Sequence, residues 1–251
     1  MKIKQDIPWY KSDYLRNKWL TKKTSHYIFH YFQDSLAAIN IEDIIGLKEG
    51  HYDKILSFLG AECNQTINYY IYPSFEEKIS LMGDDSPGNV IWEEFELPLT
   101  KRFEIHIVYG DECKFVGEHE DTHLLSLPWG LSTYLFCEGL AQFMEGNLFG
   151  KDIDIASKEL LNENKLYSIK DLFDNKNWGK VKPEIIYPEV GSFTRFLIKT
   201  YGLNKFKEVY QRLSRLNNFE ENLKIAELIF NKPITEIEAD WREDLTRGLE
   251  N

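Results

Sequence analysis

The spacing of apolar residues changes once along this chain of 251 residues, and that change limits the folds it can adopt. Up to about residue 110, short runs rich in aromatic and β-branched residues alternate with stretches of helical spacing and with Gly- and Pro-containing turns. From about residue 115 onward the apolar spacing is helical throughout. A mixed front half followed by a largely helical back half predicts an α+β fold.

We expect strands at residues 25–32, 67–72 and 104–109. In the last of these, Ile105, Ile107 and Tyr109 alternate with more polar positions, which predicts a half-buried strand. In the front half we expect helices at residues 42–59, stopped by Gly60, and from a Ser74 cap to Met82. The helices expected in the back half cover residues 115–127, 132–147, 155–164, 188–201, 203–216, 219–230 and 234–248.

The domain organisation follows from the same pattern. Residues 1–24 are polar, basic and aromatic, and are predicted to be an irregular or helical lead-in. We expect one domain over residues 25–251, with an α/β subdomain at 25–127 and a helical subdomain at 128–251.

Composition excludes several classes of function. The 30 Lys and Arg against 41 Asp and Glu give a net charge of −11, which argues against a nucleic-acid partner. No apolar stretch approaches the 18 residues of a membrane span. The first residues contain no apolar signal-peptide core, and Cys63, Cys113 and Cys137 are scattered as in reduced core thiols, so we expect a cytoplasmic protein. None of these features selects an oligomeric state.

The segment His119-Glu120-Asp121-Thr122-His123 carries the clearest chemistry in the sequence. Residues four apart lie about 40° apart around a helix, so His119 and His123 can bind one metal ion. Glu120 would lie beside that metal, where a carboxylate can accept a proton from water. The alternative is an amphipathic helix on which the two histidines merely pack.

A second helix is expected to supply a third ligand. Ser132 is a favourable N-cap residue, and Glu138 follows in the segment Cys137-Glu138-Gly139-Leu140-Ala141-Gln142-Phe143. Gly139 and Ala141 are small enough to let another helix approach closely. A His, His and Glu set leaves a zinc ion one open position, whereas a solvated helix carboxylate is the alternative for Glu138.

The two motifs together resemble the gluzincin branch of the zincin metallopeptidases, and in particular the bacterial peptidase MA-like proteins. The resemblance implies a zincin-like fold with zinc bound by His119, His123 and Glu138, Glu120 as general base, and a peptide or protein substrate. It extends over residues 25–247 and is sharp only over 119–143 and 187–202. Residues 104–109 are similar to the strand at the sheet edge that borders the family's active site, and the substrate is expected to lie antiparallel to them.

The resemblance also suggests a role for Tyr187, whose hydroxyl would donate to the oxyanion that develops during hydrolysis. The alternative is a tyrosine that caps a helix beginning near Pro188, with Tyr109 and Tyr134 as other oxyanion donors. His26, His30, His51 and His106 are expected to be packing or surface residues.

Two residues depart from the family pattern. Asp121 is charged where that family has an uncharged residue, lies about 200° around the helix from His119, and must therefore reach solvent or a partner. Gln142 stands where some gluzincins have an Asp that orients a ligand histidine. A rival to the enzyme is a zincin-like binding or regulatory domain whose metal is structural, although such a site would not need Glu120.

Overall fold

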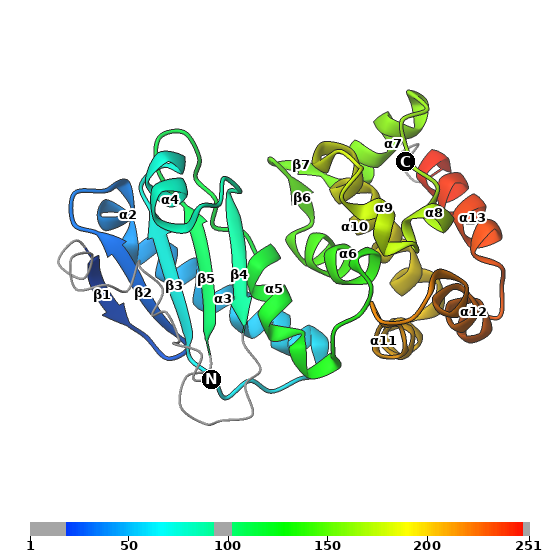
Figure 1. The fold of residues 1–251 in the computed structure, drawn as a ribbon, viewed down its shortest axis with the longest axis horizontal. Coiled ribbons are helices and arrows are strands. Elements are labelled where there is room, and N and C mark those ends of the chain that lie inside the picture. Colours follow the sequence, from blue (N-terminus) through cyan, green and yellow to red (C-terminus); the bar gives the residue numbers. More distant parts are fainter. Residues whose placement is uncertain (1–18, 93–101, 248–251) are drawn as a thin grey trace, which may run out of the picture. The chain divides into compact units, whose positions relative to one another are not determined.

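The computed structural model describes residues 19–92 and 102–247 of the chain. The chain divides into two compact units, the first ending at Leu125 and the second beginning at Ser126. Strands and helices occur together in the first unit, whereas the second is almost entirely helical (Figure 1). The predicted α+β fold class is confirmed.

The first unit is built on a five-stranded mixed sheet of order β1-β2-β3-β5-β4. The outer pairs β1–β2 and β4–β5 are antiparallel, and the inner pairs β2–β3 and β3–β5 are parallel. The strands are β1 (Trp19–Lys23), β2 (Tyr27–Phe32), β3 (Ile67–Tyr72), β4 (Gly88–Trp92) and β5 (Phe103–Val108). Because Trp19–Lys23 form a strand, the expected irregular or helical lead-in is wrong for these residues, and residues 1–18 lie outside the described chain.

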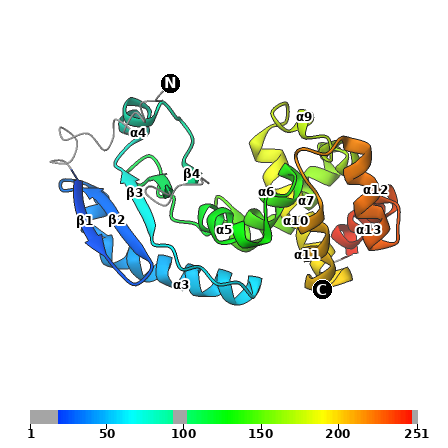
Figure 2. The ribbon, with the colours of Figure 1, turned by 60° about the horizontal axis from the view of Figure 1, so that its bottom comes forward.

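Helices cover both faces of this sheet. The helix α3 (Ile41–Leu59) lies on one face and α4 (Phe75–Met82) lies on the other (Figure 2). A short helix, α2 (Leu36–Ile39), precedes α3 in the sequence. Gly60 ends α3 in a left-handed conformation with φ of 55°, and the Ser74 hydroxyl caps α4 by accepting from the Glu77 amide at 3.1 Å. Both predicted helix boundaries are confirmed.

The strand β5 differs from its prediction in two ways. It lies between β3 and β4, so the expectation of a strand at the sheet edge is wrong, and all six of its residues are buried rather than half of them. The polar positions are covered because the His106 ring stacks on Tyr70 at 4.8 Å and lies 3.0 Å from the Tyr72 hydroxyl. The edge beside β5 is β4, whose first two residues belong to the segment 83–89, which has the composition of a turn.

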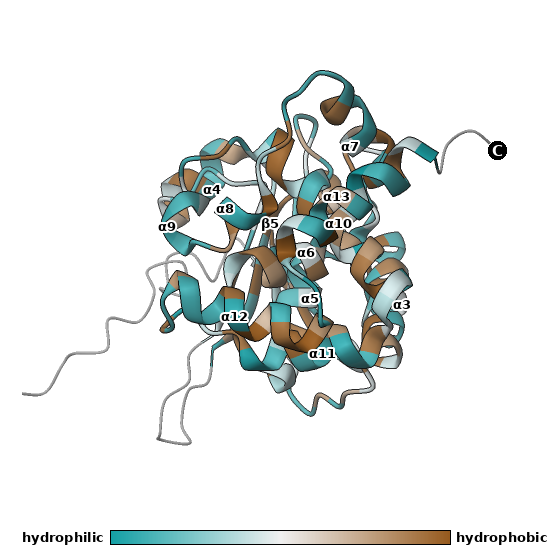
Figure 3. Ribbon diagram, turned by 90° about the vertical axis from the view of Figure 1, so that its right-hand side faces the viewer, coloured by the Kyte–Doolittle hydropathy of each residue, from teal (hydrophilic) through white to brown (hydrophobic). Residues whose placement is uncertain are grey.

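The second unit is a helical array centred on α6 (Tyr134–Glu145) and α10 (Pro183–Tyr201), which make the most extensive contact between any two described elements. Its helices are amphipathic, with hydrophilic and hydrophobic residues interspersed along α11 and α12 (Figure 3). The remaining elements are a 3-10 turn at Leu127–Trp129, the hairpin β6 (Asn147–Leu148) and β7 (Lys151–Asp152), and helices α7 (Ile153–Asn162), α8 (Ile169–Leu172), α9 (Asn175–Trp178), α11 (Leu203–Arg212), α12 (Phe219–Phe230) and α13 (Ile234–Arg247).

Several expected helix ends shift. The helix expected at 188–201 begins at Pro183, because proline is favourable in the first turn, where its missing N–H is not needed. Thr133, not Ser132, occupies the N-cap position of α6, and its side chain makes no capping hydrogen bond. No helix in residues 19–92 or 102–247 has the length and apolar character required to cross a bilayer.

Candidate metal centre

The motif histidines lie on a short helix at the end of the first unit. This helix, α5 (His119–Leu125), begins four residues later than expected, because the bridge between Tyr109 and Lys114 and a bond from the Phe115 amide to the Val108 carbonyl extend the sheet connection. The rings of His119 and His123 have centroids 4.8 Å apart, as expected for positions one turn apart. Every residue of α5 except His123 is buried.

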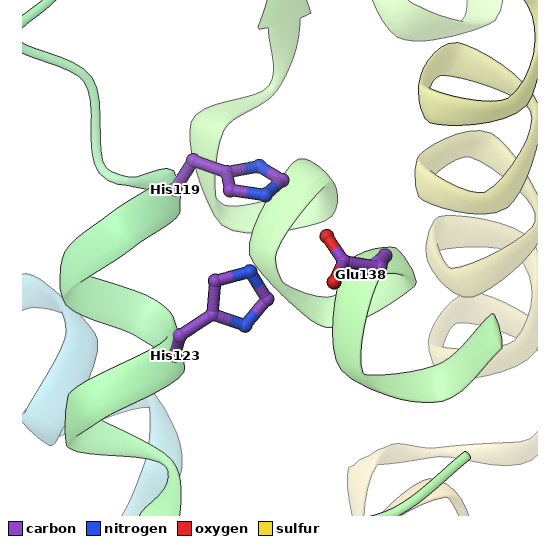
Figure 4. Close-up of side chains that lie close together, drawn as sticks. All are labelled: His119, His123 and Glu138. Carbon is purple, nitrogen blue, oxygen red and sulfur yellow. The ribbon is translucent and has the colours of Figure 1, made fainter. Parts of the chain in front are cut away.

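Three side chains of the motifs come together. His119, His123 and Glu138 each offer one ligand atom, and these three atoms lie within 4.8 Å of one another (Figure 4). Within residues 19–92 and 102–247, this is the one such group of three or more His, Cys, Asp or Glu side chains. Two imidazoles and a carboxylate are a donor set that zinc takes in hydrolytic enzymes.

Glu138 is placed by close packing between α6 and α10. A Cβ added at Gly139 would lie 2.4 Å from Thr194 Oγ1 and 3.0 Å from the Val190 carbonyl oxygen, so any larger residue would force its neighbours to shift. The predicted close approach of another helix at Gly139 is confirmed. A second contact of the same kind involves Gly191, whose added Cβ would lie 2.7 Å from the Gln142 side chain.

Gln142 has a different partner from the one expected for an orienting residue. Its amide nitrogen donates to the Asn147 carbonyl at 2.6 Å, and the Asn147 side chain in turn accepts from the Gly150 amide at 2.9 Å. Gln142 therefore ties the β6–β7 hairpin to the end of α6.

The general-base candidate Glu120 lies against the edge of the sheet. A Cβ at Gly88 would lie 2.8 Å from Glu120 Oε1 and 2.6 Å from Phe115, so the backbone of β4 passes directly beside this carboxylate. The strand β4 was not predicted from the sequence, because its first two residues belong to the segment Gly-Asp-Asp-Ser-Pro-Gly-Asn at 83–89, which has the composition of a turn. The glycine that permits this approach is the last one in that segment.

Asp121 is fully buried, and its partners are side chains of α3 and β2. Lys48 of α3 forms an ion pair with Asp121 Oδ2, and the Tyr27 hydroxyl donates to Asp121 Oδ1 at 2.7 Å. The expectation that Asp121 reaches a partner is thus confirmed. Lys48 was missed, although it lies at helical spacing between Ile44 and Tyr52 in the apolar stripe of α3.

Burial is the largest cause of the pKa shifts of Asp121, Tyr27 and His51. It raises the pKa of Asp121, although Lys48 and Tyr27 oppose this by favouring the charged carboxylate. Burial and the neighbouring Asp121 charge raise the pKa of Tyr27. Burial, helped by the positive charges of Lys48 and Lys54, lowers the pKa of His51 to about 3, so this imidazole is neutral.

The oxyanion-donor candidates occupy different surroundings. Tyr187 lies inside α10, so the interpretation of Tyr187 as a helix cap is wrong. Tyr134 is one helical turn before Glu138, with the Arg215 guanidinium 3.9 Å above its ring and Trp178 stacked at 5.9 Å. The Tyr109 hydroxyl accepts from Asn40 at 3.1 Å in the first unit.

The four other histidines have protein partners. The polar side chains that contact them include Glu49 for His26, Asn68 for His30, Glu118 for His51 and Tyr72 for His106. The three cysteines are free thiols, and of these only Cys137 is buried, so the expectation of core thiols is wrong for Cys63 and Cys113.

Neither a scan against models of known protein families nor a search of curated proteins finds a match to this chain.

Proposed function

We propose that this protein is a zinc-dependent peptidase that hydrolyses peptide bonds. The observation that carries the proposal is the convergence of ligand atoms of His119, His123 and Glu138 within 4.8 Å. The resemblance to the gluzincins also supports it, since the same three residues match that family's ligands. The substrate class we propose is a peptide or protein, with no nucleic-acid and no membrane partner.

The residues present fit a zinc ion. Ligand atoms bound to a tetrahedral zinc lie about 3.4 Å apart, since each bond is about 2.1 Å long. Side-chain rotations of the half-buried His123 and Glu138 can close the remaining separation. Zinc supplies a Lewis acid that polarises a carbonyl oxygen and makes water more acidic.

The protein's own residues would divide the remaining work. A Glu120 carboxylate oxygen takes the proton from the attacking water and passes it to the leaving amine nitrogen. Tyr187 donates its hydroxyl proton to the developing oxyanion in a hydrogen bond. We place the substrate strand against β4 rather than at residues 104–109, because β4 is the sheet edge beside Glu120.

The second candidate function is a zincin-like binding or regulatory domain in which the metal is structural. The buried Glu120 carboxyl group beside strand β4 favours the enzyme, because a structural site needs no base and usually closes its fourth position. We place the protein in the cytoplasm, a proposal supported by its three free cysteines.

Cleavage of a broad peptide library by wild type and Glu120→Gln tests the activity. The variant keeps the size of the side chain and cannot act as a base, so we expect it to retain zinc and lose about 10²–10⁴-fold in rate. Glu112→Gln, which changes an exposed acid upstream of α5, should cleave at the wild-type rate. Equal rates for wild type and Glu120→Gln would contradict the mechanism, and a wild type that cleaves nothing would favour the binding domain.

A further inference from the structure

One face of α3 directs two lysines and a neutral histidine at the segment that precedes and begins α5. Lys48, His51 and Lys54 recur at intervals of three, and all three contact residues between Gly117 and Asp121. The outer two contact Glu118, with Lys54 at 2.7 Å and His51 at 3.6 Å. The innermost, Lys48, has no exposed side-chain surface.

Lys48 makes two bonds that lie on either side of His119 in the sequence. Its ammonium donates to the Gly117 carbonyl at 2.9 Å and forms an ion pair with Asp121. The ammonium also lies 4.8 Å above the ring of Tyr69 on the central strand β3. The connection therefore runs from the sheet and α3 to both ends of the stretch that contains His119 and Glu120.

The helix α5 needs such a connection. Seven residues are too few for a helix to be stable alone, since nucleation costs more than so few hydrogen bonds return. Its direction must therefore be set by tertiary contacts. A buried ion pair is directional, and it is frequently no more stabilising than apolar residues of the same volume. Its presence here is better explained by orientation than by stability.

We propose that Lys48, acting through Asp121 and Gly117, is a positioning residue that holds His119 and Glu120 in their metal-binding and basic orientations. This inference rests on the proposed function, because it assigns Lys48 a role toward the proposed zinc. Lys48 contacts Gly117, Asp121 and Tyr69 rather than the metal ligands, and it acts by fixing the backbone on both sides of His119. The Tyr27 hydroxyl completes the arrangement by occupying the second oxygen of Asp121.

The test measures zinc affinity and the free energy of unfolding in a variant in which Tyr27, Lys48 and Asp121 are all replaced by apolar residues. In Tyr27→Phe/Lys48→Met/Asp121→Leu no buried charge is left without a partner, so the fold should survive. We expect zinc affinity, measured on the full chain by competition with a chromophoric chelator, to fall roughly tenfold. The visible spectrum of the cobalt-substituted protein should change as well, because the ligand geometry relaxes.

Lys78→Met is the matched control. Lys78 is also a fully buried lysine on a helix of the first unit, paired with Asp84 at 2.7 Å, and it does not contact residues 117–121. We expect this variant to lose stability and to keep wild-type zinc affinity and the wild-type cobalt spectrum. If the triple variant does not fold, Lys48→Met/Asp121→Asn removes both charges, keeps a side chain that can accept from Tyr27, and should also lower zinc affinity roughly tenfold.

The outcomes separate the two proposals. Wild-type protein that binds no zinc overturns the proposed function and this inference with it. Wild-type protein that binds zinc, together with a triple variant of unchanged affinity and cobalt spectrum, overturns the positioning role of Lys48 alone. In the absence of a folded triple variant, unchanged affinity and spectrum in Lys48→Met/Asp121→Asn do the same. An equal loss of affinity in Lys78→Met also overturns it, because the effect would then belong to any buried lysine.

Discussion

The two helices that carry the candidate ligands are held in place by different forces. The helix α5 is seven residues long, and charged and polar side chains from α3 and β2 tie it to the sheet. The helix α6 is twelve residues long and is held by close backbone packing on α10, at Gly139 and at Gly191. In a buried ion pair two side chains hold the helix in place, whereas in close packing many contacts along the helix surface share that role.

This difference has consequences for mutation. Removing one partner of the pair beneath α5 leaves an uncompensated charge in the interior, which is among the most damaging single changes. Adding a methyl group between α6 and α10 forces two packed helices to shift, which costs less because neighbouring side chains share the adjustment.

The largest effect on stability is expected for Asp121→Leu. Lys48 would stay buried without its counter-charge, so the free energy of unfolding should fall by about 3–5 kcal/mol. The measurement is urea denaturation followed by fluorescence. Lys199→Met removes an ion pair with Asp244 in which both side chains are exposed, at 66% and 41%, and should change stability by less than about 1 kcal/mol. Equal losses in the two variants would show that burial does not distinguish these pairs.

On the α6 and α10 side, Tyr187→Phe tests the oxyanion donor. Removing only the hydroxyl should lower the rate of hydrolysis by roughly 10²–10³-fold and change the Michaelis constant much less, because the bond strengthens in the transition state. Steady-state kinetics on one peptide substrate gives both values. If Tyr187→Phe keeps the wild-type rate and Tyr134→Phe or Tyr109→Phe loses much of it, the oxyanion donor is Tyr134 or Tyr109 instead of Tyr187.

A third prediction concerns Glu189, a buried acid of α10. Burial raises its pKa to about 8, because only one oxygen, Oε2, accepts a bond, from the Tyr167 amide at 3.1 Å, while Oε1 has no partner. Between pH 4.5 and 8 the unfolded chain ionises and the folded chain retains the proton, so this group makes stability fall as pH rises through that window.

Glu189→Gln should remove this slope. We expect the variant to be more stable than wild type by about 3 kcal/mol at pH 7, with no advantage below pH 4.5. Thermal unfolding of both proteins from pH 4 to 9 measures the difference. Parallel pH profiles for the two proteins would show that Glu189 is ionised in the folded state.

The smallest effect is expected for Gly139→Ala. The added Cβ would meet Thr194 Oγ1 at 2.4 Å and the Val190 carbonyl at 3.0 Å, so the variant should lose about 1–2 kcal/mol of unfolding free energy. Gly50→Ala is the matched control, because nothing lies within 4 Å of a Cβ at this position of α3, and it should gain about 0.5–1 kcal/mol. A gain in both variants would remove the packing argument for α6.

Elements set by local rules agreed with the sequence analysis. The strand at 67–72, the helix capped by Ser74 and the helix end at Gly60 have the predicted bounds, because caps and turns act within a few residues. The close approach at Gly139 was also predictable, since small residues beside a candidate ligand indicate helix packing.

Features that depend on residues distant in the sequence differed from their predictions. The strand β4 was not predicted, because its first two residues belong to the turn-like segment 83–89 and its pairing with β5 gives no local signal. Burial of both faces of β5 depends on aromatic rings from β3, which the alternation of its own residues does not reveal. Lys48 was visible only as a lysine in an apolar stripe, and its partner Asp121 lies 73 residues away.

The most direct test of the central claim is the zinc content of protein purified without chelator, compared between wild type and His123→Ala. We expect about one zinc per wild-type chain and loss of most of it in the variant, because two of the three ligands cannot retain the ion. Circular dichroism of the same samples establishes that the variant is folded. Full zinc occupancy in folded His123→Ala, or none in wild type, would contradict a metal centre formed by His119, His123 and Glu138.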